Sequence, residues 1–422
     1  MGRRVAIVGA GAAGLSAAFH LKKSNSITLF ERDPRLGGHA WTFTIKDGPD
    51  AGLPLDLGFM VMNVQKYPKM SKMLASFDTV RLGHSEMSFS YCCRETGQEY
   101  ALNYDRIRAP IMGRSANDVP SPLTSMVGEI LRFSKNASRD LANSQFNEIS
   151  LEDYLESISV PAPVREKYIL PIGAALWSAP PNLILKFPAE SFLRFLDNHG
   201  FLGFSTPLDW KHIVGGSQRY VQSLAECCSH IAVRAGEPIT RITRTNSGVE
   251  IQIQGGETEW FDVAIIATHA DQALSLLADA DEEERDLFNV IRYQNNEAVL
   301  HWDDSVMPRT TAAWASWNYE RETLNGSKNI CVTYHLNRLQ GHHNTDRQYF
   351  LTLNRHAEID ADKILLKTTF EHPVFDAAMI RSQEKIAQRG LKNAVFFAGS
   401  YLGYGFHEDA IASGFVAAKA IG

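Results

Sequence analysis

The sequence has little cysteine, and none of it is spaced for redox or structural chemistry. Five cysteines occur among 422 residues, and four of them form the adjacent pairs Cys92-Cys93 and Cys227-Cys228. An odd number in such pairs does not form a disulfide framework. No Cys-x-x-Cys motif is present for dithiol redox chemistry. We therefore expect a protein of the reducing cytoplasm.

Long apolar runs, an excess of one charge and metal-binding motifs are absent as well. No uninterrupted apolar run reaches the roughly 18 residues that a transmembrane helix needs. The net charge of −6 argues against nucleic acid as a main partner. The histidines, including His342-His343, show no H-E-x-x-H spacing, so no metal site is expected. A chain of 422 residues exceeds one simple core, and two interleaved lobes are expected.

The most informative motif is present near the N-terminus. A short apolar run, residues 5–8, leads into a glycine-rich loop that contains Gly9, Gly11, Ala13 and Gly14, and a helical segment follows. The next apolar run ends in Glu31, at about the 20-residue distance typical of dinucleotide sites. Gly9 permits the turn, Gly11 lets the backbone approach a diphosphate, and Gly14 allows close helix–strand packing. Glu31 can accept a hydrogen bond from a ribose hydroxyl. The order predicts a dinucleotide-binding βαβ unit.

A second glycine pair follows this unit, which a nicotinamide site does not need. The segment runs from Glu31 to Trp41 and resembles the flavoprotein amine oxidase and phytoene desaturase superfamily, whose members carry an acid, a short turn and Gly-Gly-Arg beside the FAD pyrophosphate. His39 stands where arginine is usual. The resemblance implies FAD as cofactor and a cofactor role for Arg32, Gly37, Gly38, His39, Ala40 and Trp41.

Three further segments resemble the same superfamily. Near the C-terminus, residues 395–400 and 405–414 resemble its closing strand, Ala-Gly turn and helix, whose positive N-terminal dipole faces the flavin pyrimidine. Ser400 stands where many flavoproteins have aspartate. The segment after Asp56 resembles the turn that passes the flavin ring, and the mid-chain meander resembles the adenine site. The implied cofactor residues are Gly58, Phe59, Met60, Ile239, Ala267, Thr268, Gly399, Ser400, Phe406 and His407.

The resemblance implies an α/β fold with a Rossmann-type, GR2-like FAD-binding domain. That domain would comprise residues 1–80, 208–275 and 385–422. Residues 81–207 and 276–384 would build an interleaved α+β substrate domain with an antiparallel sheet. Strings such as residues 301–304, 313–319 and 403–409 resemble one subfamily, the predicted NAD/FAD-binding oxidoreductases often encoded beside cyclopropane-fatty-acid-synthase-like methyltransferases.

Several side chains are candidates for the reaction itself. Tyr404 and Phe406 flank the C-terminal turn, where related amine oxidases place an aromatic cage over the flavin. His199, which precedes Gly200, is a candidate general base, with helix C-capping as the alternative. Four tryptophans could line the substrate cavity or pack in the core: Trp177, Trp210, Trp314 and Trp317.

Ser121 to Asn136 has apolar residues at helical spacing, with arginine and lysine nearby. This pattern is typical of an amphipathic helix packed on the core, and it also fits a lid or a transient membrane-surface contact through which a lipid enters.

The leading hypothesis is an FAD-dependent oxidoreductase that takes hydride to flavin N5 from a hydrophobic, lipid or acyl-chain substrate, by dehydrogenation or desaturation. The alternatives are an amine oxidase that forms an imine and hydrogen peroxide, and an FAD-dependent double-bond isomerase. The substrate, the electron acceptor, covalent flavin attachment and the oligomeric state stay open.

Overall fold

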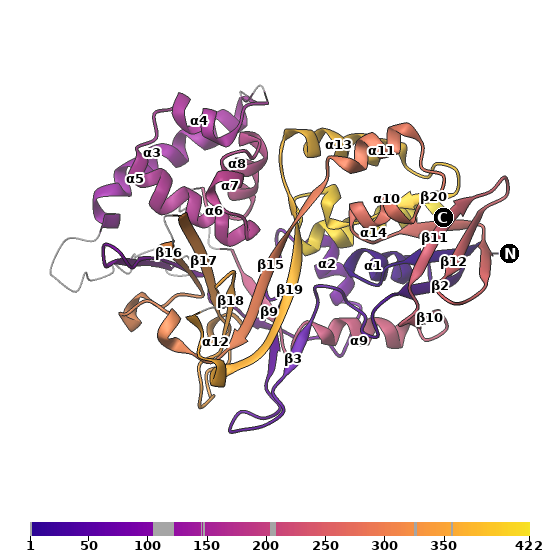
Figure 1. The fold of residues 1–422 in the computed structure, drawn as a ribbon, viewed down its shortest axis with the longest axis horizontal. Coiled ribbons are helices and arrows are strands. Elements are labelled where there is room, and N and C mark those ends of the chain that lie inside the picture. Colours follow the sequence, from indigo (N-terminus) through magenta and orange to yellow (C-terminus); the bar gives the residue numbers. More distant parts are fainter. Residues whose placement is uncertain are drawn as a thin grey trace.

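The computed structural model describes residues 2–103, 122–144, 146, 148–202, 208–324, 327–355 and 358–422. It is a mixed α/β protein with several sheets (Figure 1). One lobe holds both ends of the chain, and the other holds a group of helices above a second sheet. Two long strands, β15 (Arg292–His301) and β19 (Ile364–Val374), run between the lobes.

The first lobe is built on a parallel sheet whose strands come from three distant parts of the chain. Its order is β10-β2-β1-β14-β20. The strands are β10 (Ala232–Ala235), β2 (Ser26–Glu31), β1 (Arg4–Val8), β14 (Val263–Ile266) and β20 (Val395–Phe397). β1, β14 and β20 are short apolar runs that are almost wholly buried, as expected of parallel strands covered on both faces.

Alternating side chains of β1 serve two separate cores. Val5 and Ile7 pack with helices α1 (Ala12–Leu21), α2 (Pro68–Leu74), α9 (Gln218–Cys227) and α14 (His407–Ile421). Ala6 and Val8 pack on the opposite face. There the cover consists of α10 (Ala270–Leu276), α11 (Glu282–Asn289), α13 (Ala377–Arg389) and an antiparallel meander of β11 (Ile239–Arg244), β12 (Val249–Ile253) and β13 (Thr258–Phe261).

The second lobe is built on a seven-stranded sheet of order β19-β15-β18-β17-β16-β7-β8. Its remaining strands are β18 (Phe350–Leu353), β17 (Ser327–His335), β16 (Trp317–Leu324), β7 (Ser88–Cys93) and β8 (Gln98–Asn103). All neighbours are antiparallel except β16 and β7. This is the antiparallel sheet that the resemblance implied, while the exact domain boundaries stay predictions.

Helices cover the second sheet, and short strands and turns connect the lobes. The helices are α3 (Pro122–Ala142), α4 (Leu151–Ser157), α5 (Ala162–Val164), a π-helical turn (Arg165–Ile169), α6 (Leu170–Trp177), α7 (Pro181–Ile184) and α8 (Ala189–Asn198). The small strands are β3 (Thr42–Thr44), β4 (Pro54–Asp56), β5 (Met62–Asn63), β6 (Leu82–His84) and β9 (Trp210–Ile213), and α12 is Leu336–Leu339. The described residues also form 3-10 turns at Asp304–Val306, Thr311–Ala313, Ala361–Lys363 and Ser400–Leu402.

A buried carboxylate joins the two lobes. Asp56 is fully buried and accepts hydrogen bonds from Thr42 Oγ1 at 2.6 Å and from the backbone N and Oγ of Ser217, each at 2.8 Å. Gln340 Nε2 of the second lobe also donates to it, at 2.8 Å. Burial raises the pKa of Asp56 to about 6. A carboxylate that is costly to bury is held here because several donors converge on it.

The predicted amphipathic helix is present as α3. Met126, Ile130 and Phe133 are buried in the core, so most of its apolar face has a packing role. Val127 and Leu131 remain 38% and 45% exposed. Ser121 and the side chain of Leu123 lie outside the described residues. Within the described part of the chain, no helix is both long and apolar enough to span a bilayer.

Candidate active site

One large cavity runs between the carboxyl edge of the parallel sheet and the sheet of the second lobe. Its volume is about 940 Å³, at the upper end of the range for small-molecule sites. Its walls come from loops after β1, β2, β14 and β20 on one side and from β15 to β19, α6 and α8 on the other. A ligand there would contact both lobes.

The first end of the cavity is formed by the glycine-rich loop. The Gly9 amide donates to the Phe30 carbonyl at 2.8 Å, which extends the β1–β2 pairing to the start of the turn between β1 and α1. α1 starts at Ala12, and its N-cap residue Gly11 makes no side-chain cap. A Cβ placed on Gly11 would meet no atom within 4 Å. The first amides of α1 are therefore left for an anion, and open space lies beside them.

Glu31 shapes this loop as well as facing the cavity. Its Oε2 accepts from the Ala10 amide at 2.8 Å, and its Oε1 accepts from the Asp33 amide at 3.0 Å. Carboxylate oxygens have further lone pairs, so Glu31 can still accept from a ribose hydroxyl. Ile239 and Glu237 line the same end.

The second glycine pair packs directly on the first loop. The Gly37 amide donates to the Ala10 carbonyl at 2.9 Å, and a Cβ on Gly38 would lie 3.2 Å from Gly11 Cα. Arg35, which the sequence did not single out, donates to the Gly38 carbonyl at 2.8 Å, and its guanidinium carbon lies 4.7 Å from the centroid of the Trp41 ring. The arginine thus fixes the backbone that carries His39.

The C-terminal turn and α14 close the cavity on the side of the Phe59 loop. The Phe59 and His407 rings stack at 4.0 Å and 12°. The Tyr220 hydroxyl and His407 Nε2 share a hydrogen bond at 2.7 Å, and burial lowers the pKa of His407 to about 3, so the ring is neutral. Asp409 Oδ2 accepts from the Phe406 amide at 2.9 Å, and desolvation raises the pKa of Asp409 to about 7. These contacts hold the start of α14 at the cavity wall.

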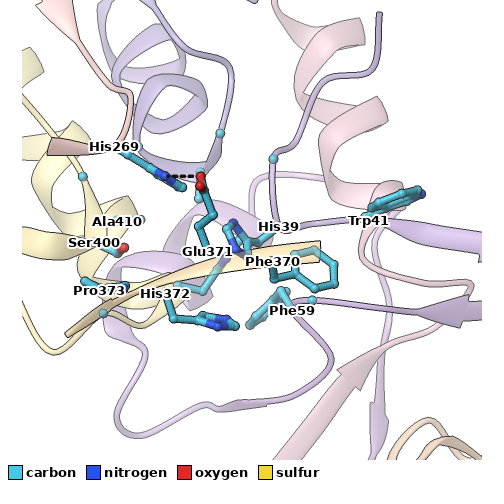
Figure 2. A pocket seen from close by; sticks show the side chains of 18 of the residues that line it. His39, Trp41, Phe59, His269, Phe370, Glu371, His372, Pro373, Ser400 and Ala410 are labelled. Atoms are coloured by element: carbon cyan, nitrogen blue, oxygen red, sulfur yellow. Dashed lines mark ion pairs between the residues drawn. The ribbon is translucent and has the colours of Figure 1, made fainter. Parts of the chain in front are cut away.

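Three imidazoles converge at the middle of the cavity (Figure 2). His39 lies after the second glycine pair, His269 caps the start of α10, and His372 lies on β19. The His39 ring centroid lies 5.6 Å from that of His372 and 6.2 Å from that of His269. His269 Nδ1 lies 3.3 Å from Glu371 Oε2. No motif had pointed to His269, Glu371 or His372.

The opposite end of the cavity is aromatic and aliphatic. Phe406 stacks on Phe195 at 4.5 Å and 17°, and both line the wall. The other residues at this end share small, apolar or aromatic character: Ala175, Leu176, Ser178, Trp210, Trp317, Tyr334, Leu351 and Leu353. We expect this end to receive a substrate.

His199 lies at this end and is the C-cap residue of α8. Its Nδ1 contacts the Phe195 carbonyl oxygen at 2.9 Å, and its ring stacks on that of Phe195 at 3.8 Å. Because the carbonyl can only accept, Nδ1 carries the hydrogen and Nε2 is left as an acceptor. Burial lowers the pKa of His199 to about 4, which makes it a weak base at neutral pH.

Most of the cofactor residues expected from the sequence line this one cavity. They are Gly9, Gly11, Ala13, Glu31, Arg32, Gly38, His39, Trp41, Gly58, Phe59, Met60, Ile239, Ala267, Thr268, Gly399, Ser400, Phe406 and His407. Gly14, Gly37 and Ala40 do not line it. A Cβ on Gly14 would lie 1.9 Å from the Gly9 oxygen, so this glycine allows close packing beneath the loop.

Three of the expected substrate-side residues lie outside the lining. Trp177 is buried behind Phe406 and donates from Nε1 to the Tyr404 carbonyl at 3.2 Å. Trp314 donates to the Pro308 carbonyl at 2.8 Å and packs beside His335. The Tyr404 ring packs edge-on against Phe195. The contacts of these three rings favour a packing role, and their part in the reaction stays a prediction. His199, Trp210, Trp317 and Phe406 do line the cavity.

The residues present fit the FAD that the resemblance implies. The open space beside Gly11, the uncapped start of α1 and the buried, unpartnered His39 Nε2 form a cradle suited to a diphosphate. Glu31 is placed for a ribose, and the start of α14 supplies a second helix dipole beside the middle of the cavity.

Comparisons with known proteins agree with this fit. The family model described as flavin containing amine oxidoreductase matches residues 12–343. A flavin-containing monooxygenase, FMO GS-OX5 of Arabidopsis thaliana, is 40% identical over 67 residues, which span 16% of this chain and 14% of that protein.

Two solved structures share the fold over nearly the whole chain. Wild-type putrescine oxidase bound to putrescine gives a TM-score of 0.70 at 16% identity, with 99% of this chain and 98% of that chain covered. A CLA-producing fatty acid isomerase from P. acnes gives 0.67 at 16% identity, with 98% and 97% covered. Together with the family match and the cradle beside Gly11, these comparisons lead to one assignment: the chain belongs to the flavin-containing amine oxidoreductase family and is an FAD-dependent enzyme.

Proposed function

We propose that this enzyme dehydrogenates a hydrophobic, uncharged substrate of the lipid or acyl-chain type. The observation that carries the proposal is the character of the cavity walls in the second lobe. Among the described lining residues of α6, α8 and β15 to β19, only Glu371 is charged, and it lies beside His269 at the middle of the cavity. Phe195, Phe406 and Trp317 provide a wall that favours a chain of methylene groups.

The charge pattern argues against a substrate with a fixed ionic group at this end. A cationic amine buried here would lack a carboxylate partner among the described lining residues of α6, α8 and β16 to β18, and an ionised fatty acid would lack a lysine or arginine. His199 is neutral at pH 7 because its pKa is lowered to about 4. An ester, an alcohol, a hydrocarbon chain or a neutral amine would avoid this desolvation cost.

FAD, when bound, supplies the acceptor for a hydride. The role of the chain's own residues is to hold the reacting carbon and to exclude water. The stacked pair of Phe195 and Phe406 forms one wall, and positioning of this kind contributes much of an enzyme's rate. The second hydrogen leaves as a proton, and we propose that the unprotonated His199 Nε2 accepts it and passes it to solvent, so that a carbon–carbon double bond forms.

Amine oxidation is the second candidate, since the family and the putrescine oxidase fold both favour it. In that reaction a neutral amine would dock between the aromatic rings and leave as an imine, with FAD supplying the electron acceptor and oxygen as the final oxidant that yields hydrogen peroxide. Double-bond isomerisation, the activity in the name of the P. acnes neighbour, is a third candidate reaction.

We also propose action in the cytoplasm, since none of the five cysteines, all in the described part of the chain, forms a disulfide.

Anaerobic bleaching of the flavin absorbance distinguishes these candidates. The protein is mixed with unsaturated and methyl-branched acyl esters, and separately with primary and secondary amines. Bleaching by the acyl compounds supports the proposal, and bleaching by amines alone would overturn it. A product of unchanged mass, formed without oxygen uptake, would identify an isomerase.

A further inference from the structure

The cavity contains little permanent positive charge for a ligand that carries a diphosphate. Of the described residues that line it, only Arg32 and Arg35 are permanently cationic. The Arg35 guanidinium already donates to the carbonyl groups of Leu36, Gly38 and Ala40. Arg32 is largely exposed, and its Nε lies 4.0 Å from Asp33 Oδ1. Much of the charge that balances a diphosphate must therefore come from elsewhere.

His39 lies beside the place where that charge is needed, and the rings of His372 and His269 lie 5.6 Å and 6.2 Å from the His39 ring. His39 directly follows Gly38. A Cβ added to Gly38 would lie 3.2 Å from Gly11 Cα at the start of α1, so the two loops are in close contact. Its Nε2 is buried without a hydrogen-bond partner among the described residues. A buried nitrogen of this kind is costly unless a ligand pairs with it.

His372 presents a hydrogen of known position. Asn296 Oδ1 accepts from Asn354 Nδ2 at 2.8 Å, so Asn296 Nδ2 is the atom that faces His372 Nδ1, also at 2.8 Å. Because Nδ2 can only donate, His372 Nδ1 accepts, and the hydrogen of the neutral ring is on Nε2.

His269 completes the cluster and lies beside a carboxylate. Figure 2 shows Glu371 reaching from β19 toward His269, and Nδ1 and Oε2 are 3.3 Å apart. The Glu371 side chain is 41% exposed, and unscreened it would repel an entering anion. A proton on His269 would turn this repulsion into a neutral ion pair.

The surroundings disfavour protonation of the cluster. Burial, together with the charges of His372, His269, His407 and Arg35, holds the pKa of His39 well below its usual value. Burial lowers the pKa of His372 to about 4. Around His269, Glu371 and Asp271 favour the proton, while burial and Arg32 oppose it, and the net pKa is lowered. Two negative charges placed beside the rings would favour the protonated form.

We propose that His39, His269 and His372 form a proton-dependent anion site, so that binding of the FAD diphosphate takes up a proton from solvent. The linkage has a defined sign. Because a bound diphosphate raises the pKa of the cluster, affinity for FAD is highest below the pKa of the empty cluster. It falls as pH rises toward the higher pKa of the complex and is constant above it. One linked proton limits this fall to about tenfold per pH unit.

The test is a titration of apoprotein with FAD between pH 5.5 and 8.5, followed by flavin fluorescence. Proton uptake is measured at pH 7 by calorimetry in two buffers of different ionisation enthalpy. ADP-ribose carries the same diphosphate without the flavin, and adenosine carries none. We expect uptake of up to about one proton with FAD and ADP-ribose, and none with adenosine.

Two substitutions at one position sharpen the test. His39→Arg replaces a titrating group with a permanent cation, which also disfavours a proton on His269 and His372, so FAD binding should persist with a flatter pH profile. His39→Gln keeps a neutral donor and should bind more weakly, again with a flatter profile. No proton uptake by the wild-type protein, or a wild-type slope in His39→Arg, would overturn the proposal. No substrate is used, so the outcome is independent of the proposed reaction.

Discussion

The two ends of the cavity are built in different ways. At the end near Gly11 the ligand-facing groups are mostly backbone, namely the amides at the start of α1 and the turn held by Glu31. At the end near Phe195 they are side chains from α6, α8, β16, β17 and β18. Backbone sites require particular glycines at particular spacings, whereas a side-chain wall can be made from many residues. The end near Gly11 can therefore be recognised from a sequence motif, whereas the end near Phe195 cannot.

The largest expected effect belongs to the backbone end. Gly11→Val should abolish FAD retention, because the side chain would fill the open space beside the first turn of α1. The absorption spectrum of the purified variant, before and after acid precipitation, measures bound flavin and also reveals covalent attachment. A yellow variant with one flavin per chain would contradict the assignment of this loop.

The next effect belongs to the side-chain end. Phe406→Ala should slow single-turnover flavin reduction by up to about 100-fold, because the wall beside Phe195 is lost. Tyr404→Ala is the matched control, since its ring lies outside the lining and should change the rate by less than about threefold. Stopped-flow absorbance of FAD-loaded variants checks both. Equal slowing by the two substitutions would restore Tyr404 to the active site.

A smaller effect is expected for a substitution at the backbone end, where Glu31 faces the cavity. Glu31→Gln should weaken FAD binding by about 1–2 kcal/mol, because a charge-assisted bond to the ribose is replaced by a neutral one. The amide also keeps only one oxygen for the Ala10 and Asp33 donors. Equilibrium titration of apoprotein measures the change. An unaltered Kd would remove Glu31 from the ribose role.

The smallest effect tests the core assignment of a tryptophan. Trp314→Phe removes the hydrogen bond to the Pro308 carbonyl and should cost about 1 kcal/mol of unfolding free energy. Flavin content and reduction rate should not change. Urea unfolding beside stopped-flow reduction gives both readings, and a slowed reduction would place Trp314 at the substrate.

The same contrast explains how far the sequence could lead. The loops around Gly9, Gly38 and Gly399 were predictable, because each needs a close backbone approach that few residues allow. His372 and Glu371 were not, since β19 is an ordinary long strand whose end happens to reach the cavity. The sequence also could not tell which tryptophans line the cavity and which pack in the core. Trp210 lines the cavity and Trp177 does not, yet both side chains are apolar and both are buried.

The strand order of the parallel sheet also bears on how the enzyme is made. β1 pairs with β14, and β14 pairs with β20 through Ile266 and Phe397. The ribosome must therefore synthesise Val395–Phe397 before the sheet can be completed, although the glycine loop was made among the first residues. Contacts this distant in sequence form slowly, and an unfinished chain exposes apolar strand edges that aggregate. The cavity is lined by the loops after β1, β14 and β20, so its wall is complete only once this last strand has been made.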